Sequence, residues 1–188
     1  MVNILISSVK GGVGKSTVSS ELVSSLKRTD EKFSYIDLDY QGDPMYETSI
    51  RDDAVVTVID TPPGMSENLG KWQKSADVLV IPTLMTARDM IPLQKMRDIV
   101  KANFKGPVLY VLNRWDRFNA SKDFVTWFNQ LPDTDNRVLL PQSTVFARAS
   151  EYQESVVTFA KRSPAAIAVM EMVNKVRRMA GLPEESIL

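Results

Sequence analysis

The chain has 188 residues, of which 44% are hydrophobic and 24% charged, and its 23 basic side chains balance 23 acidic ones. These values are ordinary for a folded globular protein, and the length predicts one domain over residues 1–188. The sequence has neither cysteine nor histidine, which excludes disulfides, zinc–thiolate sites, thiol nucleophiles and histidine bases and leaves carboxylates, lysines, backbone groups and metal-bound water for any chemistry.

Apolar runs of the kind buried on both faces of a sheet alternate along the chain with segments of helical spacing. We expect strands near residues 2–8, 33–38, 54–60, 77–82, 107–113 and 136–140. We expect helices near residues 15–29, 66–75, 88–103, 120–130 and 164–180. Ser163 and Pro164 are typical of the N-cap and first position of the last helix. This alternation predicts an α/β fold with a doubly wound, mostly parallel sheet flanked by helices on both faces.

The first strand-to-helix turn carries the sequence Lys10-Gly11-Gly12-Val13-Gly14-Lys15-Ser16-Thr17. Glycines there let the backbone curl into a nest of N–H groups at a helix N-terminus, where phosphate oxygens bind. We expect Lys15 to reach the outer phosphates, Ser16 to bind Mg²⁺ through its hydroxyl and Thr17 to contact the inner phosphate. Val9 stands where the usual G-x-x-x-x-G-K-[ST] pattern has its first glycine. The alternative is a glycine-rich turn with solvated lysines.

A second lysine distinguishes this loop. Lys10 lies five residues before Lys15, so two ammonium groups converge on one small loop. They repel each other unless a strongly negative group lies between them, and a triphosphate is such a group. The loop therefore predicts a P-loop nucleotide-binding protein.

Carboxylates follow two of the predicted strands. Asp60 ends one strand and can hold Mg²⁺ at the carboxyl edge of the sheet, where ligands of such folds bind. Asp37 and Asp39 alternate at another strand end and project to the same side. The alternatives are a turn residue before the Pro62-Pro63-Gly64 segment and two solvated carboxylates that cap a strand.

These motifs resemble those of the ParA/MinD family of deviant Walker A ATPases, and most of all the short plasmid-partition ParA type (ParF-like). Residues 7–17 are similar to the family's phosphate loop, residues 33–43 to its motif ending in D-x-D-P-Q-G, and residues 55–64 to its Walker B strand. Tyr40 replaces the family's common proline. The stretch from Gln41 to Asp60 is only 20 residues long, which is shorter than in larger members.

The resemblance implies a slow, Mg²⁺-dependent ATPase that binds ATP and ADP. It implies that Asp39 orients the attacking water, that Asp37 supports the metal shell alongside Ser16 and Asp60, and that Lys10 reaches the phosphates of a second subunit. The adenine contacts that it implies are Asn113, Arg114 and Pro141, for each of which a plain strand-end turn is the alternative.

The resemblance also implies a homodimer on ATP binding, a centromere-binding (ParB-like) adaptor and nonspecific DNA as partners. Zero net charge excludes a molecule that binds nucleic acid over its whole surface. Local cationic candidates for DNA contact remain, namely Arg148, Lys161, Arg162, Lys175, Arg177 and Arg178. A solvated cationic face near a helix C-terminus is the alternative reading of these residues.

Location and cargo are further expectations. The chain begins directly with a strand and has no apolar run of membrane-spanning length, so we expect a cytoplasmic protein, associated with the nucleoid if it binds DNA. The tail Gly181-Leu182-Pro183-Glu184-Glu185 is acidic and broken by proline, which argues against a stable membrane anchor. The competing function is a positioning or assembly scaffold that acts on a protein or membrane cargo without DNA. An amide-forming ligase is more distant, because the short chain leaves little room for a substrate domain.

Overall fold

The computed structural model describes residues 1–39, 45–64 and 69–186. Its strands are β1 (Val2–Ile6), β2 (Phe33–Asp37), β3 (Val56–Asp60), β4 (Val78–Leu84), β5 (Val108–Trp115) and β6 (Arg137–Pro141). They form one six-stranded sheet in the order β2-β3-β1-β4-β5-β6, and each neighbouring pair is parallel. The sheet confirms the predicted α/β fold, with β1 between strands that come later in the chain.

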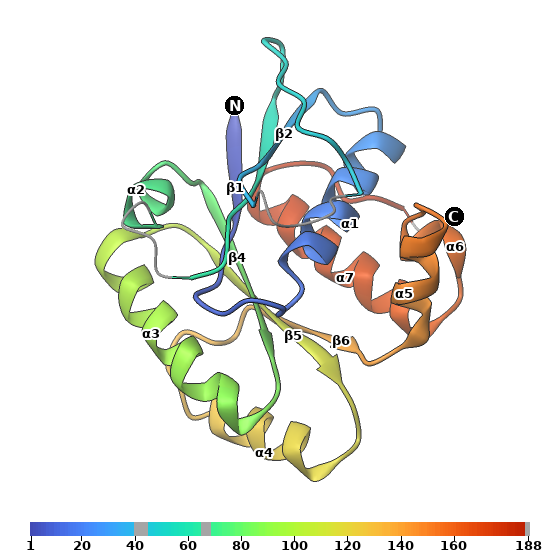
Figure 1. Ribbon diagram of the computed structural model, residues 1–188. Helices are drawn as coiled ribbons and strands as arrows, with labels where there is room; N and C mark the ends of the chain where they lie inside the picture. The colour runs from blue at the N-terminus through green and yellow to red at the C-terminus, as the bar shows by residue number, and fades with distance from the viewer. Residues whose placement is uncertain (40–44, 65–68, 187–188) are drawn as a thin grey trace.

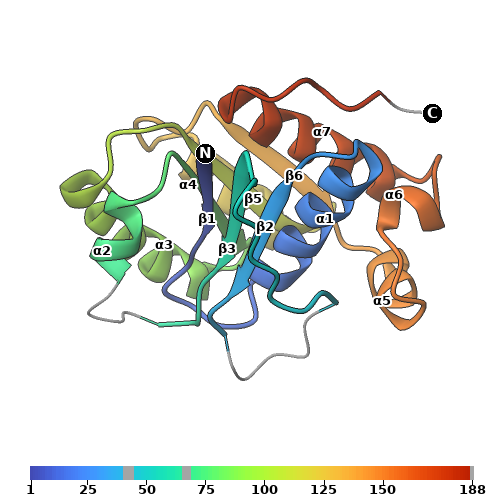
Figure 2. The ribbon, with the colours of Figure 1, turned by 90° about the horizontal axis from the view of Figure 1, so that it is seen from above.

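The helices cover both faces of this sheet (Figures 1 and 2). They are α1 (Lys15–Arg28), α2 (Leu69–Lys74), α3 (Ala87–Asn103), α4 (Asn119–Phe128), α5 (Thr144–Glu151), α6 (Val156–Phe159) and α7 (Pro164–Met179). Helices α2, α3 and α4 lie on one side, and α1, α5, α6 and α7 lie on the other. Right-handed crossovers between parallel strands produce this arrangement.

Alternate residues of the strands divide the core into two apolar layers. Ile4 and Ile6 of β1 belong to the cluster that contains α1 and α7, whereas Leu5 belongs to the cluster that contains α3 and α4. Because successive side chains of a strand point to opposite faces, a continuous apolar run fills both layers. The apolar runs of the sequence are therefore the buried strands.

The element boundaries differ from expectation in a few places. β1 ends at Ile6 instead of residue 8, because the chain already turns into the glycine-rich loop. The first residues of the helix expected at 66–75 lie outside the described residues, and α2 is described from Leu69. Helices α5 and α6 were not expected. The N-cap of α7 is confirmed, since Ser163 Oγ accepts a hydrogen bond from Ala166 N at 3.1 Å.

Candidate functional site

The loop between β1 and α1 turns at two glycines. Gly12 has a φ of +70° and Gly14 a φ of +101°, both in the left-handed region that side chains disfavour. Gly11 lies against Pro63, whose ring would be 3.4 Å from an added Cβ. Gly14 is the N-cap of α1, and it has no side chain that could accept a hydrogen bond from the first N–H groups of the helix. The first N–H groups of α1 are thus left for an outside acceptor, and the helix N-terminus favours an anion.

The first turn of α1 places three polar side chains at this cradle. Lys15 is 5% exposed, and its positive charge acts to lower the pKa of Asp60. Among the residues that the structure describes, no carboxylate forms an ion pair with Lys15. Ser16 and Thr17 line a cavity of about 220 Å³. Val13, the residue before Gly14, is buried. The predicted phosphate-binding residues are therefore brought together around one helix N-terminus.

Asp60 ends β3 beside the cradle and is fully buried. Its Oδ2 accepts a hydrogen bond from Ser19 Oγ at 3.0 Å, whereas its Oδ1 has no partner among the described residues. Burial raises the pKa of Asp60 to about 6, against the opposing effects of the Ser19 and Ser16 hydroxyls and the Lys15 ammonium. A buried carboxylate oxygen without a partner is costly, so a ligand at this point would stabilise it.

The side-chain oxygen atoms of Asp60 and Ser16 are of the kind that a hard divalent cation prefers. The described residues contain no group of three or more acidic side chains that could enclose a metal ion. Mg²⁺ does not need one, because it keeps several waters and binds through one or two carboxylates together with phosphate oxygens. The unpartnered Oδ1 of Asp60 and the nearby Ser16 hydroxyl are oxygen donors of that kind.

Asp37 ends the neighbouring strand β2 next to this point, and Asp39 follows it by two residues. Asp37 is the register partner of Asp60 in the β2–β3 pair, and its negative charge contributes to the raised pKa of Asp60. Asp37 Oδ1 accepts a hydrogen bond from Asp39 N at 2.8 Å, which turns the chain after β2. Residues Tyr40 and Gln41 of the same motif lie outside the described residues. The structure thus brings the three predicted carboxylates to one edge of the sheet.

The side chain of Lys10 has a different environment from that of Lys15. Its Nζ lies 2.5 Å from Asp89 Oδ1 near the start of α3, and its side chain is 34% exposed. Asp89 is buried and also accepts a hydrogen bond from the Thr86 hydroxyl. Sequence reasoning missed Asp89, although an acidic residue three positions after a threonine is a helix-start signal. The two lysines of the loop therefore have different environments.

A second cavity, of about 430 Å³, adjoins the cradle on the side of β5 and β6. Its lining includes Gly14, Asn113, Arg114 and Pro141, so the three predicted adenine contacts surround one space. Asn113 is 8% exposed, and Arg114 has a φ of +57° in a strand irregularity between Leu112 and Trp115.

The predicted DNA contacts do not form one patch. Arg177 is 2% exposed, so it is not available to a surface ligand, contrary to expectation. Lys175 donates to Arg137 O at 2.6 Å, and Arg178 pairs with Glu184 at 2.8 Å. The cations that remain exposed around α5 and α6 are Arg148, Lys161 and Arg162.

The spacing of α7 explains the burial of Arg177. This residue follows Val173 by four positions and Met170 by seven, and both of these are buried. Such spacing puts Arg177 on the inward face of the helix, and this signal could have been read from the sequence.

A family comparison agrees with this geometry. The profile of the CobQ/CobB/MinD/ParA nucleotide binding domain matches residues 4–156. A comparison with curated protein sequences found no match. None of the described helices is both long and apolar enough to cross a bilayer.

Solved structures with a similar fold come from several organisms. An ATP complex of a McdA variant from Cyanothece is 15% identical with a TM-score of 0.80, over 99% of this chain and 98% of that one. MinD with Mg-ADP from Pyrococcus horikoshii is 17% identical with a TM-score of 0.71, over 96% and 97%. A plasmid partition protein from Borrelia burgdorferi is 18% identical with a TM-score of 0.62, over 86% and 99%. At these identities the likeness shows the fold alone.

Proposed function

The chain belongs to the CobQ/CobB/MinD/ParA nucleotide-binding family and is a P-loop ATPase of the ParA/MinD type, and we propose that ATP acts in it as a switch that pairs two copies for DNA partition. The observation that carries this proposal is the contrast between its two loop lysines. Lys15 is buried at the cradle, whereas Lys10 is partly exposed and held by Asp89. In this scheme residues 1–188 act as one ATPase domain of the short plasmid-partition type.

The chemistry proposed for the cradle is positioning and charge stabilisation. The loop amides and Lys15 bind the phosphates, while Ser16 and Asp60 would hold Mg²⁺ with Asp37 supporting its shell. Bound Mg²⁺ supplies positive charge to the phosphate oxygens. Asp39 orients the attacking water. Because the sequence lacks histidine, hydrolysis relies on preorganised charge instead of a strong base, and we expect slow basal turnover to ADP and phosphate.

The proposed dimer uses Lys10. Its ammonium leaves Asp89 and contacts the triphosphate bound by the other copy, which makes ATP part of the interface. The experiment is analytical ultracentrifugation of wild type, Lys10→Ala and Lys122→Ala with Mg-ATP and with Mg-ADP. Lys122 is an exposed lysine on α4 and serves as the matched control. We expect wild type and Lys122→Ala to dimerise with ATP only and Lys10→Ala to remain monomeric. A Lys10→Ala protein that pairs and hydrolyses ATP normally would exclude this role.

The proposed DNA surface is the exposed cationic group around α5 and α6, namely Arg148, Lys161 and Arg162. A dimer doubles this group to six cations, which is enough for salt-sensitive phosphate binding. Arg148 also lies 5.4 Å from the Phe159 ring centroid, which orients its guanidinium. A centromere-bound adaptor would then stimulate hydrolysis and release the DNA.

The test of this surface is a titration of random duplex DNA at two salt concentrations, with ATP present. We compare a triple alanine variant of Arg148, Lys161 and Arg162 with a triple alanine variant of Lys71, Lys74 and Lys101. The second set is exposed on the opposite side of the sheet and changes the net charge equally. We expect only the first variant to lose binding and the dependence of affinity on salt. Equal losses in both would mean that no defined surface exists there.

A cargo other than DNA is the second candidate. It is favoured by the burial of Arg177 and by the intramolecular contacts of Lys175 and Arg178, so that half of the six expected cations already have partners within the chain. In that case the chain is a positioning or assembly scaffold for a protein or membrane cargo. Co-sedimentation with anionic vesicles, together with no ATP-dependent DNA binding, would favour this function.

A further inference from the structure

Asn113, at the end of β5, bonds to the phosphate loop 100 residues earlier in the chain. Its Nδ2 donates a buried hydrogen bond to Val13 O at 2.9 Å. Its Oδ1 accepts a hydrogen bond from Arg114 N at 2.8 Å. One side chain thus joins the loop before α1 to the irregular end of β5.

The two bonds fix the orientation of the amide. If the group were flipped, Oδ1 would face the carbonyl oxygen of Val13, and Nδ2 would face the N–H of Arg114. The first contact would then bring two acceptors together and the second two donors, and both would be repulsive. The NH₂ group of Asn113 is therefore directed at the loop.

The loop is shaped to receive this amide. A Cβ added at Gly14 would lie 2.3 Å from Asn113 Nδ2. Only glycine leaves room for that approach, and Gly14 also has the positive φ that glycine tolerates best. The absence of a side chain at Gly14 thus serves both the turn and the contact with Asn113.

We propose that Asn113 is a positioning residue, which holds Val13 and Gly14 in the conformation that presents the loop amides to phosphate. This inference rests on the proposed nucleotide-binding function. It assigns to Asn113 a role that is independent of the base, beyond the adenine contact expected from the sequence. Without this bond Val13 O is left buried and unpaired, and the loop samples conformations that do not bind phosphate.

The distinguishing experiment uses a ligand without a base. Binding of ATP, GTP and inorganic tripolyphosphate is measured by calorimetry for wild type, Asn113→Ala and Asn113→Asp. We expect both substitutions to lower the affinity for all three ligands by a similar factor of about ten. This is the size expected for the loss of one buried hydrogen bond. Aspartate keeps the shape of asparagine but places an oxygen against Val13 O, so it does not rescue the loop.

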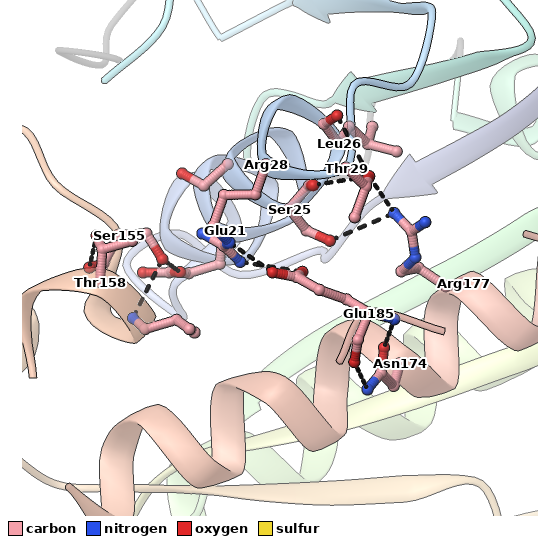
Figure 3. A network of polar contacts seen from close by, with 12 residues as sticks. Glu21, Ser25, Leu26, Arg28, Thr29, Ser155, Thr158, Asn174, Arg177 and Glu185 are labelled. Atoms are coloured by element: carbon pink, nitrogen blue, oxygen red, sulfur yellow. Dashed lines mark hydrogen bonds and ion pairs between the residues drawn. The ribbon is translucent and has the colours of Figure 1, made fainter. Parts of the chain in front are cut away.

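Asn174→Ala is the matched control, because Asn174 on α7 makes two similar bonds far from the loop. It donates to Glu185 O at 3.0 Å and accepts from Glu185 N at 2.8 Å (Figure 3). We expect this variant to lose stability without any change in tripolyphosphate affinity.

Amide hydrogen exchange of the nucleotide-free protein gives a second measurement. Exchange at Val13, Gly14 and Lys15 should quicken in Asn113→Ala and stay unchanged in Asn174→Ala. If Asn113→Ala weakens ATP binding but leaves tripolyphosphate binding and the exchange rates of the loop unchanged, Asn113 contacts the base. That result would overturn the positioning role. If wild type binds no nucleotide, the proposed function fails, whereas the exchange measurement still tests the role of Asn113.

Discussion

At the scale of single residues, Asp89 determines where Lys10 lies. Its side chain is 1% exposed and receives both the Lys10 ammonium and the Thr86 hydroxyl. Lys10 is partly exposed and can be solvated when the ion pair opens, but the buried Asp89 carboxylate then keeps only the Thr86 hydroxyl as a partner among these contacts, which makes opening costly. If Lys10 is to contact a second copy, the ion pair with Asp89 must first open. Asp89 thus opposes dimerisation in the proposed switch.

Asp89→Asn should therefore promote pairing. The amide keeps the shape of the carboxyl group and the contact with Thr86 but removes the charge that attracts Lys10. We expect the dissociation constant of the ATP-bound dimer to fall by more than about tenfold, because neither of the two copies has to open an ion pair to a buried carboxylate. Sedimentation across a concentration series measures this, with Asp123→Asn, an exposed carboxylate on α4, as the control. Weaker pairing in Asp89→Asn would contradict the proposed opening of this contact.

At the scale of elements, α1 connects the phosphate cradle to the C-terminal part of the chain (Figure 3). Near its middle, Glu21 accepts a hydrogen bond from Ser155 Oγ at 2.5 Å. At its end, Arg28 forms a bidentate pair with Glu185 at 2.6 and 3.1 Å. The guanidinium of Arg177 on α7 donates to the hydroxyl of Ser25 in α1 and to that of Thr29, the C-cap of α1. The helix that begins at the nucleotide site is thus tied to α6, α7 and the tail.

Arg177→Met should destabilise the protein far more than Arg178→Met. Arg177 is buried and donates to Pro183 O at 2.5 Å and Glu31 Oε1 at 3.0 Å, so its loss leaves several acceptors unpaired. We expect the free energy of unfolding to fall by about 3 kcal/mol. Arg178 is exposed and pairs only at the surface, so its loss should cost less than about 0.5 kcal/mol. Urea denaturation measures both, and equal effects would exclude a structural role for Arg177.

At the scale of the whole molecule, the strand order explains how distant residues meet. β1 lies between β3 and β4, so the loop that follows β1 opens at the same edge where Asp37 and Asp60 end their strands. Asn113 reaches this edge from β5. Ligands of open α/β sheets bind at such a crossover edge. The candidate site is therefore a product of the sheet, although its residues are scattered along the chain.

The stability of the whole molecule should depend on pH through buried carboxylates, because the sequence has no histidine. Burial raises the pKa of Glu21 above 4.5, against the opposing effects of Ser155, Val156 N and Arg28. The folded protein thus holds this proton to higher pH than the unfolded chain. The contribution of Glu21 is greatest below pH 4.5 and is lost as pH rises through the folded pKa.

Glu21→Gln should reduce this fall in stability with rising pH. The variant cannot ionise, so the unfolding free energy measured by urea denaturation should change less above pH 4.5 than in wild type. The control is Glu154→Gln, which should keep the wild-type profile, because Glu154 is exposed although it lines the cavity of about 220 Å³ together with Glu21. An unchanged profile in Glu21→Gln would contradict the raised pKa.

Local patterns predicted the sheet and the cradle. The strands are apolar runs that must be buried on both faces, and the glycines of residues 11–14 sit at a strand-to-helix turn, so both can be recognised without knowledge of distant contacts. The short helices α5 and α6 were missed because eight and four residues give little periodicity.

Contacts between distant segments could not be predicted in this way. The pairing of Lys10 with Asp89 joins residues 79 positions apart and depends on how α3 packs on the sheet. The amide of Asn113 required the position of Val13, which only the order of β1, β4 and β5 supplies. Arg177 is different, because its helical spacing already placed it inside.

The irregular end of β5 also bears on how the protein can be observed. Trp115 is 37% exposed and directly follows Arg114, which lines the larger cavity. Trp72 and Trp127, the other two tryptophans, pack against the apolar cluster around α3 and α4. Changes in indole emission on adding nucleotide should therefore come mainly from Trp115. The chain carries an intrinsic optical reporter beside its own site, and occupancy can be followed without attaching a dye.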